Sequence, residues 1–321
     1  MATLVTGGTG FVGLHVLKQL ADQGVDVVSM STRGTLDGTA MAFLGPAAER
    51  VKCLKLDILD LEGLRGAIRE YEIGAVVHGA AVTAIGETER RQPREAVMVN
   101  VCGTATALEA ARLEGVRRFV YLSSALVYGS SDPTVPISED QPPRPSGIYA
   151  VTKHAAECLV LRYGELFEFE TALLRISAPY GPLEHPTGGR QLLSLIHGWC
   201  RAALAGGTVR VEGDLARDFT YVGDTAAGIA LAATVPSIPR RLYNLACGRN
   251  ISFREVLSLL KTLCPGLRVI EVTAKEEFFF RESQRGPLAI DRARRELGFI
   301  PATDLVQGLK TYLEWLTNHA H

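Results

Sequence analysis

The sequence lacks the features that mark several classes of protein. Its 34 lysine and arginine residues nearly balance 35 aspartate and glutamate residues, so it has no bulk charge with which to hold nucleic acid. It has no uninterrupted run of about 18 apolar residues, the length that a membrane-spanning helix needs. Its first residues, "MATLVTGG", show no cationic region and no cleavage site of a signal peptide. We therefore expect a cytoplasmic protein that binds neither nucleic acid nor membranes.

Cysteine is sparse and scattered. The six cysteines form no CxxC pair, and no histidine-rich segment accompanies them. This spacing does not suit a zinc site or a disulfide framework. We expect buried, free thiols and no metal site. The cysteines are Cys53, Cys102, Cys158, Cys200, Cys247 and Cys264.

The first half of the chain alternates short apolar runs with amphipathic segments. Strands are predicted at residues 3–6, 25–30, 51–56, 75–78, 119–124 and 170–175, and helices at 11–23, 61–71, 93–114 and 149–166. Strands separated by helices are joined by right-handed parallel crossovers, which cover both faces of a sheet. The pattern predicts a doubly wound α/β domain with a parallel sheet.

The pattern changes after Tyr180, where glycine and proline gather at residues 181–189. Further helices are predicted at 190–205, 224–234, 252–263 and 303–317, short strands at 208–212 and 268–272, and a buried strand at 242–246. The three phenylalanines of "EEFFFRE" (276–282) are expected to pack in a core with one ring exposed, and the alternative is that they line the substrate pocket or the lobe interface. We predict a first domain over residues 1–178, to which 214–250 returns, and a smaller, mostly helical lobe over 179–213 and 251–321.

A glycine motif, "TGGTGFVG", follows the first strand and opens the first helix. Gly7 permits a tight turn, Gly10 lets the backbone approach a pyrophosphate, and Gly13 lets the helix pack close to the sheet. The pyrophosphate would then lie at the helix N-terminus, beside Phe11 and Val12. In this strand–helix context the motif predicts a dinucleotide-binding domain.

The end of the second strand bears on the choice of dinucleotide. An acidic residue there would bind the adenosine 2′-hydroxyl of NAD, but the chain has Ser31, Thr32 and Arg33. Hydroxyls and a guanidinium suit a 2′-phosphate, so NADP is favoured over NAD. The alternative is that Arg33 points into solvent or stacks on adenine without discriminating between the two.

Two further segments are expected beside the cofactor. Asp57 and Ile58 follow the third strand, where a carboxylate can reach the adenine amino group; a helix N-cap is the alternative role for Asp57 and the better one for Asp60. Ala80 and Ala81 follow the fourth strand, and their small side chains leave room for a cofactor across the strand ends.

A tyrosine and a lysine lie four residues apart at the start of the helix predicted over 149–166. Tyr149 and Lys153 therefore share one helix face. A nearby ammonium favours the phenolate and lowers the tyrosine pKa, which makes the hydroxyl a usable acid and base. Ser124, at the end of the strand predicted over 119–124, could donate a hydrogen bond to a reacting oxygen. These residues suit hydride transfer between a nicotinamide and a secondary alcohol or ketone.

The chain resembles an extended short-chain dehydrogenase/reductase of the NAD-dependent epimerase/dehydratase kind. The matching segments are TGGTGFVG (6–13), LDILD (56–60), HGAA (78–81), NxxGT (100–104), SSALVYG (123–129), YAVTK (149–153), YGP (180–182) and RDFTYVGD (217–224). The resemblance implies a Rossmann-like fold with a C-terminal substrate lobe, a polar, sugar-like substrate and a homodimer.

The resemblance also implies roles at the matching positions. Tyr149 would be the acid/base, Lys153 would hold the nicotinamide ribose, and Ser124 would orient the substrate oxygen. Asn100 would help to shape the active site, and Arg217 would contact a substrate phosphate. Further candidates for substrate contact are Thr83, Ala125 and Tyr180, and for Tyr180 a role in packing is an equal alternative. The alternative for Arg217 is a surface ion pair with Asp218 or Asp224.

Two departures from the family pattern limit the reaction. Ala125 and Leu126 follow Ser124 where dehydratases of sugar nucleotides carry two acids, so dehydration is not expected. Ala178 stands where nucleotide-sugar enzymes usually carry an asparagine, which weakens the case for a nucleotide sugar.

Three hypotheses for the function follow. The first is a dehydrogenase or ketoreductase that exchanges its cofactor, and the second is a sugar or nucleotide-sugar epimerase that retains NAD. The third is a non-catalytic, NADP-sensing or scaffold protein. The presence of Ser124, Tyr149 and Lys153 opposes this third hypothesis.

Overall fold

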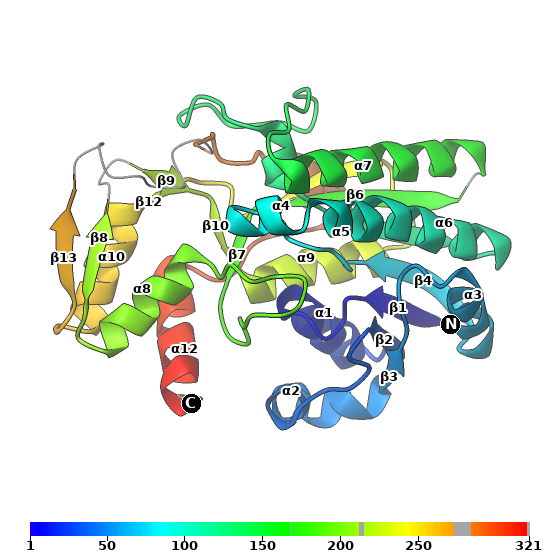
Figure 1. Ribbon diagram of the computed structural model, residues 1–321, viewed down its shortest axis with the longest axis horizontal. Helices are drawn as coiled ribbons and strands as arrows, with labels where there is room; N and C mark the ends of the chain where they lie inside the picture. The colour runs from blue at the N-terminus through cyan, green and yellow to red at the C-terminus, as the bar shows by residue number, and fades with distance from the viewer. Residues whose placement is uncertain (168, 212–214, 273–283, 320–321) are drawn as a thin grey trace.

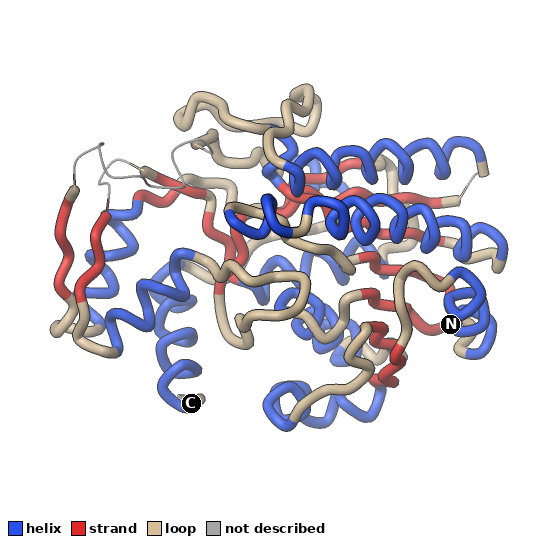
Figure 2. Tube along the Cα trace, viewed as in Figure 1, coloured by secondary structure: helices blue, strands red, loops and turns tan. Residues whose placement is uncertain are grey.

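A seven-stranded, all-parallel sheet forms the centre of the protein in the computed structural model, which describes residues 1–167, 169–211, 215–272 and 284–319. Figure 2 shows the strands between layers of helices. From edge to edge the strands are β11 (Leu242–Leu245), β6 (Glu170–Ile176), β5 (Arg118–Ser124), β4 (Ile73–His78), β1 (Ala2–Thr6), β2 (Val27–Ser31) and β3 (Val51–Lys55). The predicted doubly wound sheet is confirmed. Its strand order reverses between β1 and β4, where such sheets bind ligands.

Each face of the sheet has its own apolar core. Alternate residues of a strand point to opposite faces, so Leu4 and Val5 of β1 enter different cores. One face packs against α1 (Phe11–Asp22), α2 (Gly38–Leu44), η1 (Gly45–Arg50), α9 (Val222–Thr234) and α11 (Asp291–Leu297). The other packs against α3 (Leu61–Glu70), α6 (Gly103–Leu113) and α7 (Ile148–Leu166) (Figure 1).

The helix predicted over residues 93–114 is not a uniform α-helix. It consists of α5 (Pro93–Val97), a π-helical turn η2 (Met98–Cys102) and α6, and the short α4 (Glu87–Arg91) precedes it. A π turn inserts an extra residue into the helix and often marks a functional site. Here the turn contains Asn100, whose side chain is buried.

The smaller lobe lies beside the carboxyl ends of the strands (Figure 1). Its core joins α8 (Leu195–Leu204), α10 (Phe253–Leu263) and α12 (Leu305–Asn318), with Trp199, Phe219 and Phe253 in mutual ring contact. Its strand pairs are β8 (Thr208–Val211) with β13 (Arg268–Glu271), β9 (Ala216–Arg217) with β12 (Ile251–Ser252), and β7 (Ala178–Tyr180) with β10 (Phe219–Tyr221). The predicted domain limits at residues 178, 213 and 250 stay a prediction, and residues 276–282 lie outside the described part of the chain.

The helix predicted over 190–205 begins only at Leu195. Ser194 ends the preceding loop, because its hydroxyl accepts a hydrogen bond from the His197 amide and so caps α8. Residues 190–194 consequently remain irregular.

The cysteines are free, as predicted, but the prediction that they are buried is wrong for most of them. Cys200 is buried, whereas Cys53 and Cys158 are exposed and the other three are partly buried. Cys53 lies on β3, an edge strand whose side chains are mostly exposed, and Cys158 lies on the outer side of α7. Within the described residues, no cluster of three metal-ligating side chains occurs, and no helix has the length and apolar character of a membrane span.

Candidate active site

A cavity of about 660 Å³ lies at the carboxyl ends of the central strands, between the sheet and the lobe. Most of the site residues expected from the sequence line it. They are Gly7, Gly10, Phe11, Val12, Gly13, Ser31, Thr32, Arg33, Asp57, Ile58, Ala80, Ala81, Thr83, Ser124, Ala125, Tyr149, Lys153 and Arg217. Asn100 and Tyr180 do not line it. The cavity extends across the switch point of the sheet, as expected for a dinucleotide site.

The glycine turn after β1 is shaped for a phosphate. Gly7 has a φ of +72°, and a Cβ on Gly13 would lie 2.3 Å from the Gly7 carbonyl oxygen, so neither position tolerates a side chain without a shift. The residue before α1, Gly10, offers no side-chain acceptor to the first helical amides. These amides face the cavity with the positive end of the helix dipole, so the turn fits a pyrophosphate.

A cation, Arg33, and a carboxylate, Asp37, follow the end of β2. The Ser31 hydroxyl accepts a hydrogen bond of 3.0 Å from the Gly34 amide. The Arg33 guanidinium is 3.9 Å from the Asp37 carboxylate, and both side chains are largely exposed. A carboxylate beside Arg33 reduces the positive potential that a 2′-phosphate would meet.

Two acids follow β3 in different roles. Asp57 lines the cavity, and its Oδ1 accepts a hydrogen bond of 2.9 Å from the Leu59 amide. Asp60 caps α3 by accepting from the Gly63 amide, as predicted.

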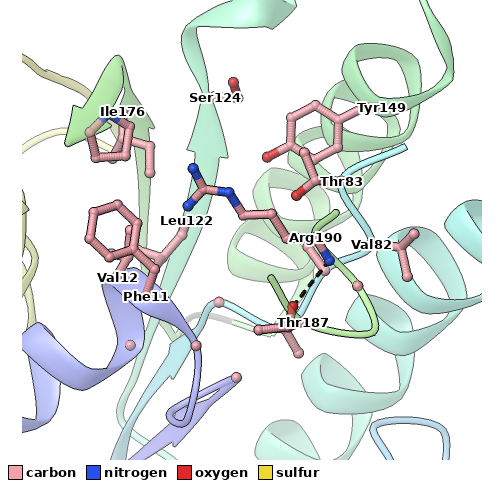
Figure 3. A pocket seen from close by; sticks show the side chains of 18 of the residues that line it. Phe11, Val12, Val82, Thr83, Leu122, Ser124, Tyr149, Ile176, Thr187 and Arg190 are labelled. Atoms are coloured by element: carbon pink, nitrogen blue, oxygen red, sulfur yellow. Dashed lines mark hydrogen bonds between the residues drawn. The ribbon is translucent and has the colours of Figure 1, made fainter. Parts of the chain in front are cut away.

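Tyr149 is placed by the start of α7. The Ile148 amide, at the first position of the helix, donates a hydrogen bond of 2.6 Å to the Glu89 carboxylate. The side chains of Ser124 and Thr83 are neutral neighbours of the Tyr149 hydroxyl. Figure 3 shows the Tyr149 and Thr83 hydroxyls facing the same part of the cavity. The arrangement places two hydroxyls where they can hold a third oxygen.

The electrostatics of Tyr149 differ from the expectation based on Lys153. Burial raises the pKa of Tyr149, and the charge of Arg190 opposes that rise, as do the side chains of Ser124 and Thr83. The Lys153 ammonium instead donates a hydrogen bond of 2.6 Å to the Leu122 carbonyl oxygen. Burial lowers the pKa of Lys153 to about 7. The expected net lowering of the tyrosine pKa is therefore absent here, because desolvation outweighs the nearby cations.

Asn100 acts from behind the cavity wall. Its amide oxygen accepts from the Val82 amide (2.8 Å), and its amide nitrogen donates to the Val82 carbonyl oxygen (3.0 Å) and to the Thr152 hydroxyl (2.9 Å). The π turn thereby joins the segment after β4 to α7. These bonds fix Thr83 relative to Tyr149.

Tyr180 is placed away from the cavity. Its side chain is buried in the core of the lobe, with its ring edge-on to Tyr221. Tyr180 therefore contributes packing to the core of the lobe.

Two arginines that line the cavity, Arg190 and Arg285, were missed from the sequence. The Arg190 guanidinium lies 5.1 Å from the Phe11 ring centroid and forms an ion pair with the buried Glu184. Arg285 lines the cavity together with Arg217. Burial lowers the pKa of Arg285 to about 9, assisted by the charge of Arg217, and burial lowers the pKa of Arg217 to about 10. Two partly desolvated guanidinium groups at one cavity attract an anionic ligand.

The two acids considered as ion-pair partners of Arg217, Asp218 and Asp224, accept hydrogen bonds from backbone amides. Asp218 accepts from the amides of Cys247, Gly248 and Leu288. Asp224 accepts from the amides of Ala302 and Thr303. These carboxylates tie the lobe to the sheet.

A family model, a curated relative and two solved structures are similar to this chain over most of its length. The model of the NAD dependent epimerase/dehydratase family matches residues 3–246. UDP-glucose 4-epimerase of Mycolicibacterium smegmatis is 31% identical, over 99% of both chains. The structure of Thermus thermophilus UDP-glucose 4-epimerase with NAD has a TM-score of 0.83 at 26% identity, covering 99% of this chain and 100% of that one. MoeE5 in complex with UDP-glucuronic acid and NAD has a TM-score of 0.82 at 31% identity, over 99% of both chains.

Proposed function

The chain belongs to the NAD dependent epimerase/dehydratase family, and from this premise we propose that it is a nucleotide-sugar epimerase that retains its cofactor. Membership makes it an NAD(P)-dependent enzyme of the extended short-chain dehydrogenase/reductase type that transfers hydride. The observation that carries the finer proposal is the pair Arg217 and Arg285 at the same cavity as Ser124 and Tyr149. From the sequence alone, an epimerase was the second hypothesis, after a dehydrogenase or ketoreductase that exchanges its cofactor.

The residues around Tyr149 suit proton transfer to and from a sugar hydroxyl. A bound nicotinamide supplies the hydride acceptor and donor. Tyr149 takes the proton from the hydroxyl as its carbon is oxidised to a ketone, and it returns the proton when the other face of the ketone is reduced. Ser124 and Thr83 hold the oxygen, and the charge of Arg190 favours the phenolate.

The arginine pair supports a diphosphate-bearing substrate. Guanidinium groups bind phosphate oxygens with two parallel hydrogen bonds, and burial strengthens such contacts. The two guanidinium groups offer the phosphate contacts that Ala178, which lines the cavity without a polar side chain, does not. The named relatives are a UDP-glucose epimerase and a protein in complex with UDP-glucuronic acid, so these two sugars are the first substrates to test.

We infer that the working cofactor is NAD, which reverses the preference for NADP expected from Ser31, Thr32 and Arg33. Two solved relatives contain NAD. In this chain, Asp37 also places a carboxylate 3.9 Å from Arg33. An epimerase regains its oxidised cofactor within each turnover, so it needs no NADPH pool.

A homodimer remains part of the proposal. The resemblance implies an interface formed by the helices near 93–114 and 149–166. In this structure Leu113, Val151 and Phe167 of that region are exposed apolar side chains. Light scattering on the purified protein should give twice the 34.6 kDa chain mass.

The first experiment is to denature the purified protein, identify the nucleotide that it releases, and assay the intact protein with UDP-glucose and UDP-glucuronic acid. We expect near-stoichiometric NAD(H) and formation of the 4-epimer without net change in absorbance at the NADH band. A protein that arrives empty and couples oxidation of a sugar hydroxyl to added NADP would instead be a dehydrogenase, and the epimerase proposal would be abandoned.

A further inference from the structure

A loop from the lobe side crosses the cavity and is fastened to the sheet side at two points. We name residues 182–194, between β7 and α8, the strap. The Pro182 carbonyl oxygen accepts a hydrogen bond of 3.0 Å from Nε2 of the buried His15, and the Gly189 carbonyl oxygen accepts one of 2.6 Å from the Thr83 amide. A Cβ on Gly189 would lie 2.7 Å from the Ala81 carbonyl oxygen. The strap therefore lies directly against the strand end that is expected beside the cofactor.

The strap holds a buried carboxylate at its base. The Glu184 side chain is fully buried and accepts hydrogen bonds from the Ser194 amide (2.7 Å), the Ser194 hydroxyl (2.7 Å) and the Tyr312 hydroxyl (3.0 Å). Nδ1 of His197 lies 2.6 Å from the same Tyr312 oxygen. Helices α8 and α12 thus fix Glu184. A carboxylate in this environment requires a cation, which Arg190 supplies.

Arg190 carries that charge into the cavity. Its guanidinium lies over the ring of Phe11, the first residue of α1, where the amides are free of a side-chain cap. Figure 3 shows the guanidinium extending toward Leu122 and Phe11, from the side on which Tyr149 lies. Its charge is also the largest electrostatic influence that lowers the pKa of Tyr149. One cation is therefore close both to the expected pyrophosphate position and to the catalytic hydroxyl.

We propose that Arg190 contacts the bound dinucleotide and that Glu184, as its positioning residue, holds Arg190 so that the strap slows cofactor release. This inference rests on the proposed function, because an enzyme that returns its hydride within one turnover benefits from a cofactor that stays bound. Arg190 and Glu184 lie on the side of the cavity that faces the smaller lobe. Their contribution to cofactor binding adds to that of the glycine turn after β1.

The test measures cofactor release directly. The protein is loaded with NADH, mixed with excess NAD, and the loss of bound NADH fluorescence is followed. Arg190→Met and Glu184→Gln should each increase the release rate by about tenfold or more, the effect of losing one charge-assisted contact. Glu255→Gln on α10, which breaks the exposed ion pair with Arg249, is the matched control and should release NADH at the wild-type rate.

The double variant separates positioning from general loosening. If Glu184 acts through Arg190, then Glu184→Gln/Arg190→Met releases NADH no faster than Arg190→Met alone. This variant also has no buried charge without a counterion, so it keeps the test valid where a single variant fails to fold. Release at the wild-type rate from the folded variants overturns the inference, and additive effects overturn the positioning role of Glu184.

The outcomes also separate this inference from the proposed function. Epimerase activity in the wild type, with unchanged release from the variants, would remove the strap's role alone. Faster release from the variants, without epimerase activity in the wild type, would remove the proposed function and leave the strap's role standing.

Discussion

The two walls of the cavity are constructed differently. On the sheet wall, the functional groups follow the ends of β1, β4 and β5 or the starts of α1 and α7 within a few residues, so the order of strands and helices brings them together. On the lobe wall, side chains are placed by contacts between distant segments, such as Tyr312 with Glu184 or Arg285 beside Arg217. We infer from this difference that the sheet wall performs the chemistry and that the lobe wall selects and retains what binds.

The largest expected effect is on the sheet wall. Tyr149→Phe removes the proton-transferring oxygen and should lower turnover by about 10²–10⁴-fold, the usual contribution of a general acid/base. Nucleotide content should remain that of the wild type, because the phenyl ring keeps the packing at the start of α7. Steady-state kinetics and nucleotide analysis measure the two quantities. Tyr163→Phe, on the same helix but away from the cavity, is the control, and full activity in Tyr149→Phe would refute the assignment.

The contrast between the walls also explains what the sequence could predict. Gly7, Gly13, Ser124 and Tyr149 stand at fixed offsets from strands or helix starts, and parallel strands bring such offsets to one edge of the sheet. Their presence in the cavity follows from short-range pattern alone. The predicted sheet was found for the same reason, with strand limits shifted by one or two residues.

The lobe wall could not be predicted in this way. Arg190 lies in a segment whose composition suggested a helix, and only the cap at Ser194 excludes it from α8. Arg285 lies in a predicted loop, around residues 276–286, in which one sequence does not separate substrate contacts from other residues. Tyr180 matches a family segment, yet its side chain turns into the lobe core. Such placements depend on tertiary contacts, which a single sequence does not show.

The second prediction tests selection by the lobe wall. Arg285→Ala and Arg217→Ala should each raise KM for a UDP-sugar by about 10²-fold, because each removes a partly desolvated phosphate contact. The turnover number should change much less than in Tyr149→Phe, since neither residue exchanges a proton with the substrate. Arg268→Ala, at an exposed position on β13, is the control. A fall in kcat with unchanged KM would assign these arginines to the chemical step.

The third prediction compares the pH response of the two regions. His78 is fully buried between Thr6 and Thr104, and burial lowers its pKa to about 3. At pH values between about 3 and 6.5, the His78 pKa in the folded and in the unfolded chain, the unfolded chain binds a proton on His78 that the folded chain does not. Stability therefore falls as the pH is lowered through this window, by about 1.4 kcal/mol per unit from this group.

His78→Gln should remove that share of the slope, measured as the free energy of urea unfolding at pH 7, 6 and 5. In the lobe, burial also lowers the pKa of His197, but this side chain is only partly buried and Glu184 opposes the shift. His197→Gln should therefore flatten the slope less than His78→Gln. A larger effect from His197 would show that the lobe, and not the sheet, controls acid sensitivity.

The smallest effect is expected at the adenosine end, where the sheet wall meets solvent. Arg33 is exposed, so Arg33→Ala should change NAD retention by less than about fivefold. Any binding of NADP should weaken more, because its 2′-phosphate would use the guanidinium. Asp37→Asn should act in the opposite direction, since it removes the nearby carboxylate while an amide oxygen can still cap α2. Competition binding measures the NADP/NAD affinity ratio, and if neither substitution moves that ratio, cofactor choice does not depend on the end of β2.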